Sequence, residues 1–331
     1  MRKALILGVT GQDGSYLAEL LLEKGYEVHG MIRRSATGNT RNIDHLISNP
    51  DLYNHQFFLH RGDLADPTSL YRIIHQVRPQ ELYNEADQDH VGWSYDMVGF
   101  SMDITGAAVG RILEIIRQID PAIRYFQPCS SNMFGRAESE IQNETTPFHP
   151  ASPYACAKVA AYHLTRYYRE AFGLFASNAI LYNHESPRRP PEYVGRKISQ
   201  AVARIACGRQ KQLVLGDLSA RIDWGYAKEY MEAAWRMLQL DHPDDFVIAT
   251  GEAHSVQEWV EEAFAVVNLK PDPYVVTDPA LLRPSKTTTL IGDITKARKA
   301  FGFDPKFKFK ELVRMMVEAD LQAERAALDR H

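Results

Sequence analysis

Two side chains four residues apart, the phenol of Tyr154 and the ammonium of Lys158, give this 331-residue chain its clearest sign of chemistry. On a helix, residues at that spacing lie one above the other. A lysine one turn from a tyrosine favours the phenolate, which makes the tyrosine a base usable near neutral pH. Ser130, earlier in the chain, adds a hydroxyl that can bind the same substrate oxygen. These residues predict removal of hydride and a proton from a substrate hydroxyl; the alternative is a surface helix with an incidental Tyr/Lys pair.

The glycines at the start of the chain have the spacing of a dinucleotide-binding turn. Gly8, Gly11 and Gly14 stand between an expected strand at Lys3–Gly8 and an expected helix at Ser15–Lys24. A diphosphate can approach backbone amides closely only where no Cβ intervenes, and the helix N-terminus adds a favourable dipole. The residues expected to bind the cofactor here are Gly8, Thr10, Gly11, Gln12, Asp13 and Gly14, with Tyr154 and Lys158 at its far end.

The residues after the second expected strand favour NADP as the cofactor, with NAD as the alternative. Arg33, Arg34 and Ser35 follow this strand, where an acid would bind an unphosphorylated ribose. Two guanidinium groups and a hydroxyl suit a 2′-phosphate instead, although solvated arginines would look the same. Asp63 and Leu64, after the third expected strand, are well placed for the adenine edge.

Apolar runs of strand length alternate with helix-length segments through the first half of the chain, which predicts a parallel sheet covered on both faces. We therefore expect an α/β fold, a doubly wound parallel sheet of the Rossmann type with a smaller C-terminal α/β substrate lobe. The expected strands are Lys3–Gly8, Tyr26–Ile32, Gln56–Arg61, Glu81–Asn84, Ile123–Gln127, Ala176–Tyr182 and Phe246–Thr250, and the expected helices are Ser15–Lys24, Pro67–Gln76, Ser94–Ile119 and Tyr154–Phe172. The expected cofactor domain is 1–182, with 223–250 returning to it, and the expected substrate lobe is 183–222 with 251–331.

Composition narrows the class of protein further. The net charge of -4, with 24% charged residues and no basic stripe, argues against a nucleic-acid partner. Cys129, Cys156 and Cys207 have no metal-ligand spacing and do not pair up, so no metal is expected and a reducing cytoplasm is the natural compartment. No apolar run approaches the roughly 20 residues that span a bilayer, and no signal peptide is expected.

Longer motifs resemble the GDP-mannose 4,6-dehydratase family of extended short-chain dehydrogenases. The resemblance covers nearly the whole chain, and it rests on these segments: Gly8-Val-Thr-Gly-Gln-Asp-Gly14, Tyr154/Lys158, Asn183-His-Glu-Ser-Pro-Arg-Arg189, Arg196-Lys197-Ile198, Asp223-Trp224-Gly225 and Ala249-Thr250-Gly251-Glu252. It implies tightly held NADP, oxidation at sugar carbon 4, loss of the carbon 5 proton and the carbon 6 hydroxyl, and return of hydride to carbon 6. It also implies a homodimer or homotetramer, and substrate contacts from Asn183, Glu185, Lys197, Arg221 and Arg283.

Departures from the family pattern affect catalysis. The family's Ser-Thr-Ser-Glu-x-Tyr-Gly is Cys129-Ser-Ser-Asn-Met-Phe-Gly135 here, so Ser130 replaces the threonine and Asn132 replaces the glutamate that acts as acid and base. A neutral amide cannot transfer that proton. The family's Asn-Leu-Ala-Ala-Gln-Ser becomes Asn84-Glu85-Ala86-Asp87-Gln88-Asp89, whose carboxylates alternate and are expected on one side of an extended segment. We expect Asp89 to carry the proton, with Asp87 as its like-charged neighbour and Glu185 in reserve; the alternative is an exposed acidic loop.

Two further departures affect binding. The family's Lys-Arg-Asp-Trp is Arg221-Ile222-Asp-Trp here, so Ile222 replaces the arginine that the family implies on the nucleotide diphosphate. The family's Arg-Pro-x-Glu is Arg283-Pro-Ser-Lys286, so Lys286 replaces the glutamate that the family implies on the ribose hydroxyls. Losing a bidentate phosphate ligand would leave a diphosphate poorly paired. We therefore expect a dehydratase that acts on a nucleotide sugar other than GDP-mannose, or on a nucleoside, with hydride returned to carbon 6 or to the ketone. The alternatives are an epimerase or ketosugar reductase, and an inactive nucleotide-binding homologue.

Overall fold

The computed structural model describes residues 1–36, 38–282 and 288–329. A seven-stranded sheet forms its centre, in the order β11-β7-β5-β4-β1-β2-β3, and every neighbouring pair is parallel. Its strands are β1 Lys3–Leu7, β2 Glu27–Ile32, β3 Phe57–Arg61, β4 Glu81–Asn84, β5 Arg124–Ser130, β7 Ala176–Leu181 and β11 Asp245–Ile248. All seven correspond to strands expected from the sequence, and the doubly wound α/β fold class is confirmed.

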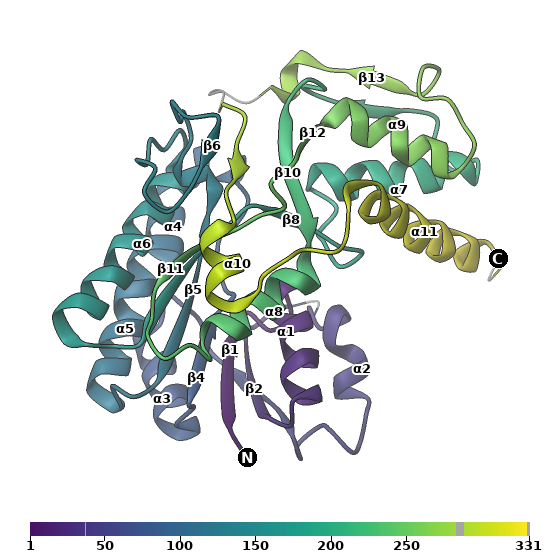
Figure 1. Ribbon diagram of the computed structural model, residues 1–331. Coiled ribbons are helices and arrows are strands. Elements are labelled where there is room, and N and C mark those ends of the chain that lie inside the picture. The colour runs from purple at the N-terminus through teal and green to yellow at the C-terminus, as the bar shows by residue number, and fades with distance from the viewer. Residues whose placement is uncertain (37, 283–287, 330–331) are drawn as a thin grey trace.

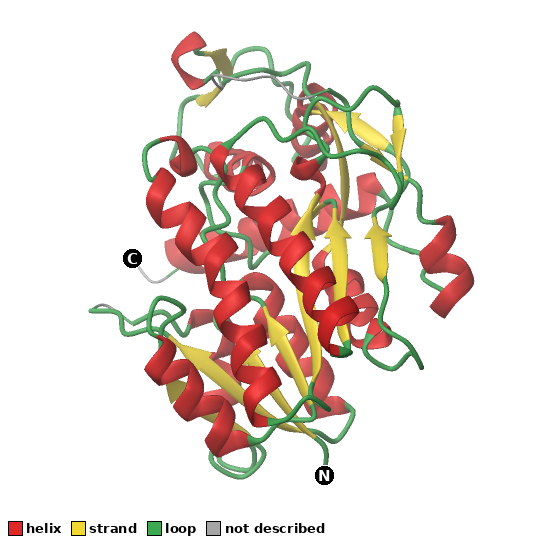
Figure 2. Cartoon of the chain, turned by 90° about the vertical axis from the view of Figure 1, so that its left-hand side faces the viewer, coloured by secondary structure: helices red, strands yellow, loops and turns green. Residues whose placement is uncertain are grey.

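Helices cover both faces of this sheet, as parallel connections require. One face is covered by α3 Pro67–Val77, α5 Ala108–Ile119 and α6 Pro153–Phe172, and the other by α1 Gln12–Glu23 and α8 Ala227–Met237. Figure 1 shows these two layers on opposite sides of the strands, and Figure 2 looks onto the layer of α3, α5 and α6. Each layer has its own buried apolar cluster against the sheet.

The segment expected as one long helix, Ser94–Ile119, is broken, which corrects the sequence expectation. It consists of a 3₁₀ turn η2 Trp93–Tyr95, a short helix α4 Val98–Ser101, a π-helical segment η3 Met102–Ala107, and then α5. Gly106 within the π segment packs closely on α6, because a Cβ there would lie 3.3 Å from the carbonyl oxygen of Ala157. Apolar periodicity does not distinguish an α-helix from a π segment that carries an extra residue per turn.

A separate region of smaller sheets and helices lies beside the carboxyl ends of the central strands (Figure 1). The largest small sheet has the order β12-β10-β8, with β8 Asn183–Glu185, β10 Arg221–Tyr226 and β12 Ala253–Ser255. The remaining pairs are β9 Leu213–Leu215 with β13 Val275–Thr277 and β6 Ile141–Gln142 with β14 Ile291–Gly292. The remaining helices are α2 Asp44–Ile47, α7 Val194–Ala206, α9 Val256–Val266, α10 Thr295–Phe301 and α11 Phe309–Leu328.

A third apolar cluster packs α7, α9 and α11 together, and one buried carboxylate ties this part to the central sheet. Asp223 in β10 accepts hydrogen bonds from the backbone N–H groups of Thr250 and Gly251, both at 2.9 Å, just after β11. The domain boundaries expected from the sequence stay a prediction. In the part of the chain that the structure describes, no helix is both long and apolar enough to cross a membrane.

Candidate active site

The glycine turn lies where β1 ends and α1 begins, and two of its glycines are required by close backbone contacts. A Cβ on Gly8, whose φ is +78°, would lie 2.5 Å from the carbonyl oxygen of Glu85. A Cβ on Gly14 would lie 2.4 Å from the carbonyl oxygen of Gly8. Gly11 is the N-cap of α1, and among the described residues no side chain caps this helix. Its first backbone N–H groups are therefore available to an anion, as the sequence predicted for a diphosphate.

The side chains of Gln12 and Asp13 attach this turn to the start of β8. Gln12 donates to the carbonyl oxygen of His184 at 3.2 Å and accepts from the hydroxyl of Ser186 at 2.8 Å. Nε2 of His184 lies 2.9 Å from the carboxylate of Asp13. Burial alone would lower the pKa of His184, but the charge of Asp13 and this hydrogen bond raise it above its ordinary value. These two side chains therefore position the turn, and their role as cofactor ligands stays a prediction.

Ser130, Asn132, Tyr154 and Lys158 lie together at the carboxyl end of β5. Ser130 is the last residue of β5, and its hydroxyl oxygen accepts from the backbone N–H and the side-chain amide of Asn132, at 3.2 and 3.1 Å. The hydroxyl of Tyr154 lies close enough to Ser130 for the serine to lower its pKa. Nζ of Lys158 lies 5.7 Å from the centre of the Tyr154 ring. The expected hydride residues are thus within reach of one another.

The start of α6 has strong sequence signals for its position. Ser152 is the N-cap and accepts from the backbone N–H of Ala155 at 3.1 Å, while Pro153 occupies the first helical position. This fixes the first turns of α6, from which the buried side chains of Tyr154 and Lys158 project.

The electrostatics of Tyr154 differ from the sequence expectation. Burial raises the pKa of Tyr154 to about 12, and the charges of Asp87 and Asp89 act in the same direction, whereas Lys158 and the hydrogen bond with Ser130 lower it. The lysine therefore acts on the phenol as expected but does not by itself bring it to phenolate near neutral pH. The main physical reason is burial of the phenol, and the charges of Asp87 and Asp89 add to its effect.

The carboxylate of Asp87 forms an ion pair with Lys158 and accepts a hydrogen bond from the hydroxyl of Thr105. Nζ of Lys158 also donates to the carbonyl oxygen of Pro128 at 2.7 Å. Asp87 is therefore occupied by protein partners on both sides.

The other two carboxylates of this segment have different surroundings. Burial and the nearby charge of Asp13 raise the pKa of Glu85 well above its ordinary value, and within the described chain its Oε1 has no hydrogen-bond partner. Asp89 is exposed and lies close to the phenol of Tyr193. The expectation that the three carboxylates share one side of the segment holds in part. Asp87 and Asp89 both raise the pKa of Tyr154, whereas the backbone of Glu85 lies against the glycine turn.

Glu185, the last residue of β8, lies in a buried cluster. Its carboxylate is 3.6 Å from Nε of Arg189, and burial raises its pKa. The guanidinium of Arg189 lies 3.6 Å over the ring of Tyr193, whose own hydroxyl faces Asp89. Asn183 and Glu185 are the first and last residues of β8, whose middle residue, His184, contacts Gln12 and Asp13 at the glycine turn.

The remaining substrate residues are more dispersed. Lys197 is half-buried in the first turns of α7. Arg221 donates to the carbonyl oxygen of Ala253 and lies 3.5 Å from the carboxylate of Glu258, so its guanidinium is engaged within its own part of the fold. Arg283 and Lys286 lie outside the described residues.

The residues expected at the adenosine end follow β2 and β3. Arg33, Arg34 and Ser35 are exposed in the segment after β2. The carboxylate of Asp63 accepts from the backbone N–H of Ala65 at 3.0 Å, and Leu64 is buried. The carbonyl oxygen of Thr10 accepts from the side-chain amide of Asn42 at 3.0 Å. Their roles as cofactor ligands stay predictions.

Sequence reasoning missed three residues of this site: Thr105, Arg189 and Tyr193. Thr105 is inside a segment that reads as an ordinary helix, so no local signal marks it. Arg189 lies in residues 186–192, which are rich in proline and arginine, and Tyr193 follows them. Only the tertiary proximity of both residues to Asp89 shows their place at the site.

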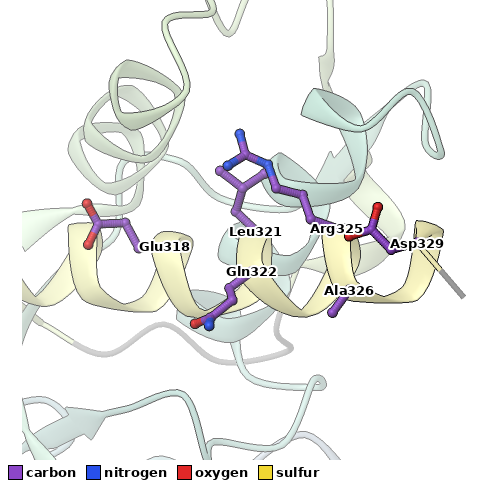
Figure 3. A pocket seen from close by; sticks show the side chains of 6 residues that line it. All are labelled: Glu318, Leu321, Gln322, Arg325, Ala326 and Asp329. Carbon is purple, nitrogen blue, oxygen red and sulfur yellow. The ribbon is translucent and has the colours of Figure 1, made fainter.

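A hollow elsewhere on the surface, of about 380 Å³, does not compete as an active site. It lies along the last turns of α11 (Figure 3), and its lining residues are Glu318, Leu321, Gln322, Arg325, Ala326 and Asp329. All six come from one helix face, which offers no nucleophile and no converging hydrogen-bond donors from other elements.

Comparison with known proteins shows the family of this chain. The sequence profile of the family described as GDP-mannose 4,6 dehydratase matches residues 5–316. GDP-mannose 4,6 dehydratase 1 of Arabidopsis thaliana is 48% identical over 324 residues, covering 96% of this chain and 90% of that protein. The human GDP-mannose 4,6 dehydratase is 45% identical over 339 residues, covering 96% and 91%.

Solved structures support the same fold. A dTDP-glucose 4,6-dehydratase from Streptomyces venezuelae superimposes with a TM-score of 0.85 at 19% identity, covering 98% of each chain. At that identity the likeness shows the fold alone, while the sequence matches above show the family. This chain belongs to the GDP-mannose 4,6-dehydratase family.

Proposed function

We propose that this chain is an NADP-dependent dehydratase that oxidises a hydroxyl of a nucleotide sugar, eliminates a neighbouring hydroxyl as water, and returns the hydride. The observation that carries this proposal is the assembly of Tyr154, Ser130 and Lys158 at the carboxyl end of β5. Substrates bind at that edge of doubly wound sheets. The family names of the relatives support a dehydratase on a nucleotide sugar.

The cofactor site fits a dinucleotide by two observations. The uncapped N-terminus of α1 offers free amides, and the crowding around Gly8 and Gly14 keeps side chains out of the turn. Arg33 and Arg34 would bind the 2′-phosphate of NADP, with NAD as the weaker alternative. When bound, the nicotinamide ring supplies the acceptor and donor of hydride. Beyond its bonds to Pro128 and Asp87, the Lys158 ammonium has one N–H left, which would bind the ribose of the cofactor.

Tyr154 takes the proton of the substrate hydroxyl, and Ser130 holds the same oxygen through its hydrogen bond. Asn132 orients the Ser130 hydroxyl from two directions. Once the hydroxyl is a ketone, the hydrogen on the adjacent carbon is acidic enough to be removed by a carboxylate.

Asp89 is the carboxylate that we propose removes this proton. It is exposed at the site, it acts electrostatically on Tyr154, and Tyr193 lies against it. Its carboxylate would take the carbon-bound proton and deliver it to the departing hydroxyl, so that water leaves and the carboxylate is restored. Glu185 is the reserve, but the ion pair with Arg189 engages it.

We further propose that GDP-mannose is not the preferred substrate. Asn132 cannot transfer a proton, Ile222 offers no phosphate contact, and Arg221 is engaged with Ala253 and Glu258. The names of the relatives give no support to this part, which rests on these residues alone. A nucleoside without the diphosphate is the alternative substrate.

We also propose that the protein forms an oligomer of two or four copies. The division into a cofactor domain and a substrate lobe after residue 182 is likewise a proposal.

One observation favours a second function, an epimerase or ketosugar reductase. Asn132 binds Ser130 and supplies no acid, so the redox step could proceed without elimination. Mass spectrometry of products from a panel of nucleotide sugars separates the two: loss of water supports the dehydratase, while unchanged mass or a gain of two hydrogens supports the alternative. No product from any member of the panel would contradict both.

A further inference from the structure

The ammonium of Lys158 is held by the carboxylate of Asp87. Only 5% of the Lys158 side chain and 11% of the Asp87 side chain are exposed, so the ion pair is largely shielded from water. A buried ion pair of this kind constrains both partners more than a surface pair does. Any effect that Lys158 has on its neighbours therefore depends on Asp87.

The π segment η3 supplies the second contact to Asp87. The hydroxyl of Thr105, within η3, donates a hydrogen bond to the carboxylate. Thr105 is buried, with 2% of its surface exposed. Gly106 then allows η3 to pack against α6 at Ala157, next to the lysine. Single turns of π-helix occur often at functional sites. Here the irregular turn brings Thr105 onto the carboxylate that pairs with Lys158.

Two opposite charges in contact offset each other's field at a third group. Lys158 favours the phenolate of Tyr154, and Asp87 opposes it. The other charged or titratable groups that face this tyrosine or lysine are Glu85 and Asp89 after β4, Cys129 in β5 and Tyr193 before α7. Asp87 differs from these because it contacts the ammonium directly.

We propose that Asp87, held by Thr105, is a positioning residue that acts through Lys158 to set the pH at which Tyr154 can accept the substrate proton. The consequence of Asp87 for turnover rests on the function proposed above. Its effect on the ionisation of Tyr154 does not, because that ionisation can be measured without a substrate. Asp87 thus controls the hydride step, and proton transfer in the elimination falls to Asp89.

The test is an NMR titration of the full chain with ¹³C-labelled tyrosine rings, in which the Tyr154 signal is identified as the one that Tyr154→Phe removes. In Asp87→Asn the lysine acts on the phenol unopposed, so the ionisation of Tyr154 should begin about one pH unit lower, the scale on which a neighbouring charge moves a pKa. Thr105→Val should shift it less in the same direction, and Thr105→Ser should restore the native titration.

Asp103→Asn is the matched control. It removes a carboxylate from the same π segment, but this carboxylate pairs with Arg111 at 2.7 Å, so the Tyr154 titration should not move. An unchanged or higher onset in a folded Asp87→Asn overturns the proposal, and so does an equal shift in Asp103→Asn. If circular dichroism shows that Asp87→Asn is unfolded, Thr105→Val decides by the same criterion. Failure of the proposed function would appear separately, as absence of hydride transfer with every nucleotide sugar.

Discussion

Asp13, in the first turn of α1, pairs with His184 in β8 across 2.9 Å, and this contact joins the glycine turn to the small sheet of β8, β10 and β12. The charge of His184 lowers the pKa of Asp13 against the opposing effect of burial, and the charge of Asp13 raises the pKa of His184. The pair is therefore most stabilising while both residues are charged.

The sign of its pH dependence follows from these two shifts. The stabilisation from His184 is complete below its unfolded pKa of about 6.5 and is lost as pH rises through the folded value. The stabilisation from Asp13 is present above about pH 3.9 and is lost as pH falls. His184→Gln should cost about 2 kcal/mol near pH 5.5 and less at pH 9, measured by denaturant unfolding. A cost that grows with pH would contradict this pairing.

Tyr154→Phe should abolish turnover and leave cofactor binding intact. The phenol takes the substrate proton, whereas the glycine turn and Lys158 remain in place. The measurement is reduction of bound cofactor by substrate, followed by absorbance, together with cofactor affinity from titration. Tyr162→Phe, at a buried tyrosine that binds Asp245 at 3.0 Å, serves as the control for loss of a buried phenol. Near-normal activity of Tyr154→Phe would exclude the hydride role.

Replacing Arg33 and Arg34 with alanine should weaken NADP far more than NAD. Both side chains are exposed after β2, so the change should leave the fold unaffected. The physical reason is that only NADP carries the 2′-phosphate that paired guanidinium groups bind. Calorimetric titration with each cofactor measures the ratio of affinities, and an equal loss for both would show that another element recognises the phosphate.

Asp89→Asn should slow water loss and solvent deuterium uptake together, by about 10²–10⁴, the usual contribution of general catalysis. The hydride step should persist, because Tyr154, Ser130 and Lys158 are unchanged. Tyr193→Phe should have a smaller effect in the same direction, since it removes only the hydroxyl beside the carboxylate. Glu185→Gln is the comparison: if it, and not Asp89→Asn, blocks deuterium uptake, the proton carrier is Glu185.

Asn132→Glu should raise the rate of GDP-mannose dehydration, because it restores an acid and base next to Ser130. The gain should reach up to about 100-fold, and it should be larger together with Ile222→Arg, which adds a phosphate ligand. Asn132→Gln has the same length without the acid and should show no gain. Efficient conversion of GDP-mannose by the native protein would refute the proposal that another substrate is preferred.

The sequence by itself determined the parts that depend on local pattern. Strands and helices of the central sheet follow apolar periodicity, and the glycine turn follows from glycines placed between a strand and a helix. The pair Tyr154 and Lys158 is determined in the same way, because a four-residue spacing is a local property. These signals were sufficient for the fold class and for placing Tyr154 and Lys158 one turn apart on a helix.

Only the tertiary structure decided how these groups affect one another. That Asp87 pairs with Lys158, that Thr105 in a π segment holds this carboxylate, and that Tyr193 lies against Asp89 depend on contacts between elements far apart in the chain. Burial, which sets the pKa of Tyr154 as strongly as any neighbouring charge, likewise comes from packing. Electrostatic interactions depend on distance and desolvation in three dimensions, and neither quantity is contained in the spacing of residues along the sequence.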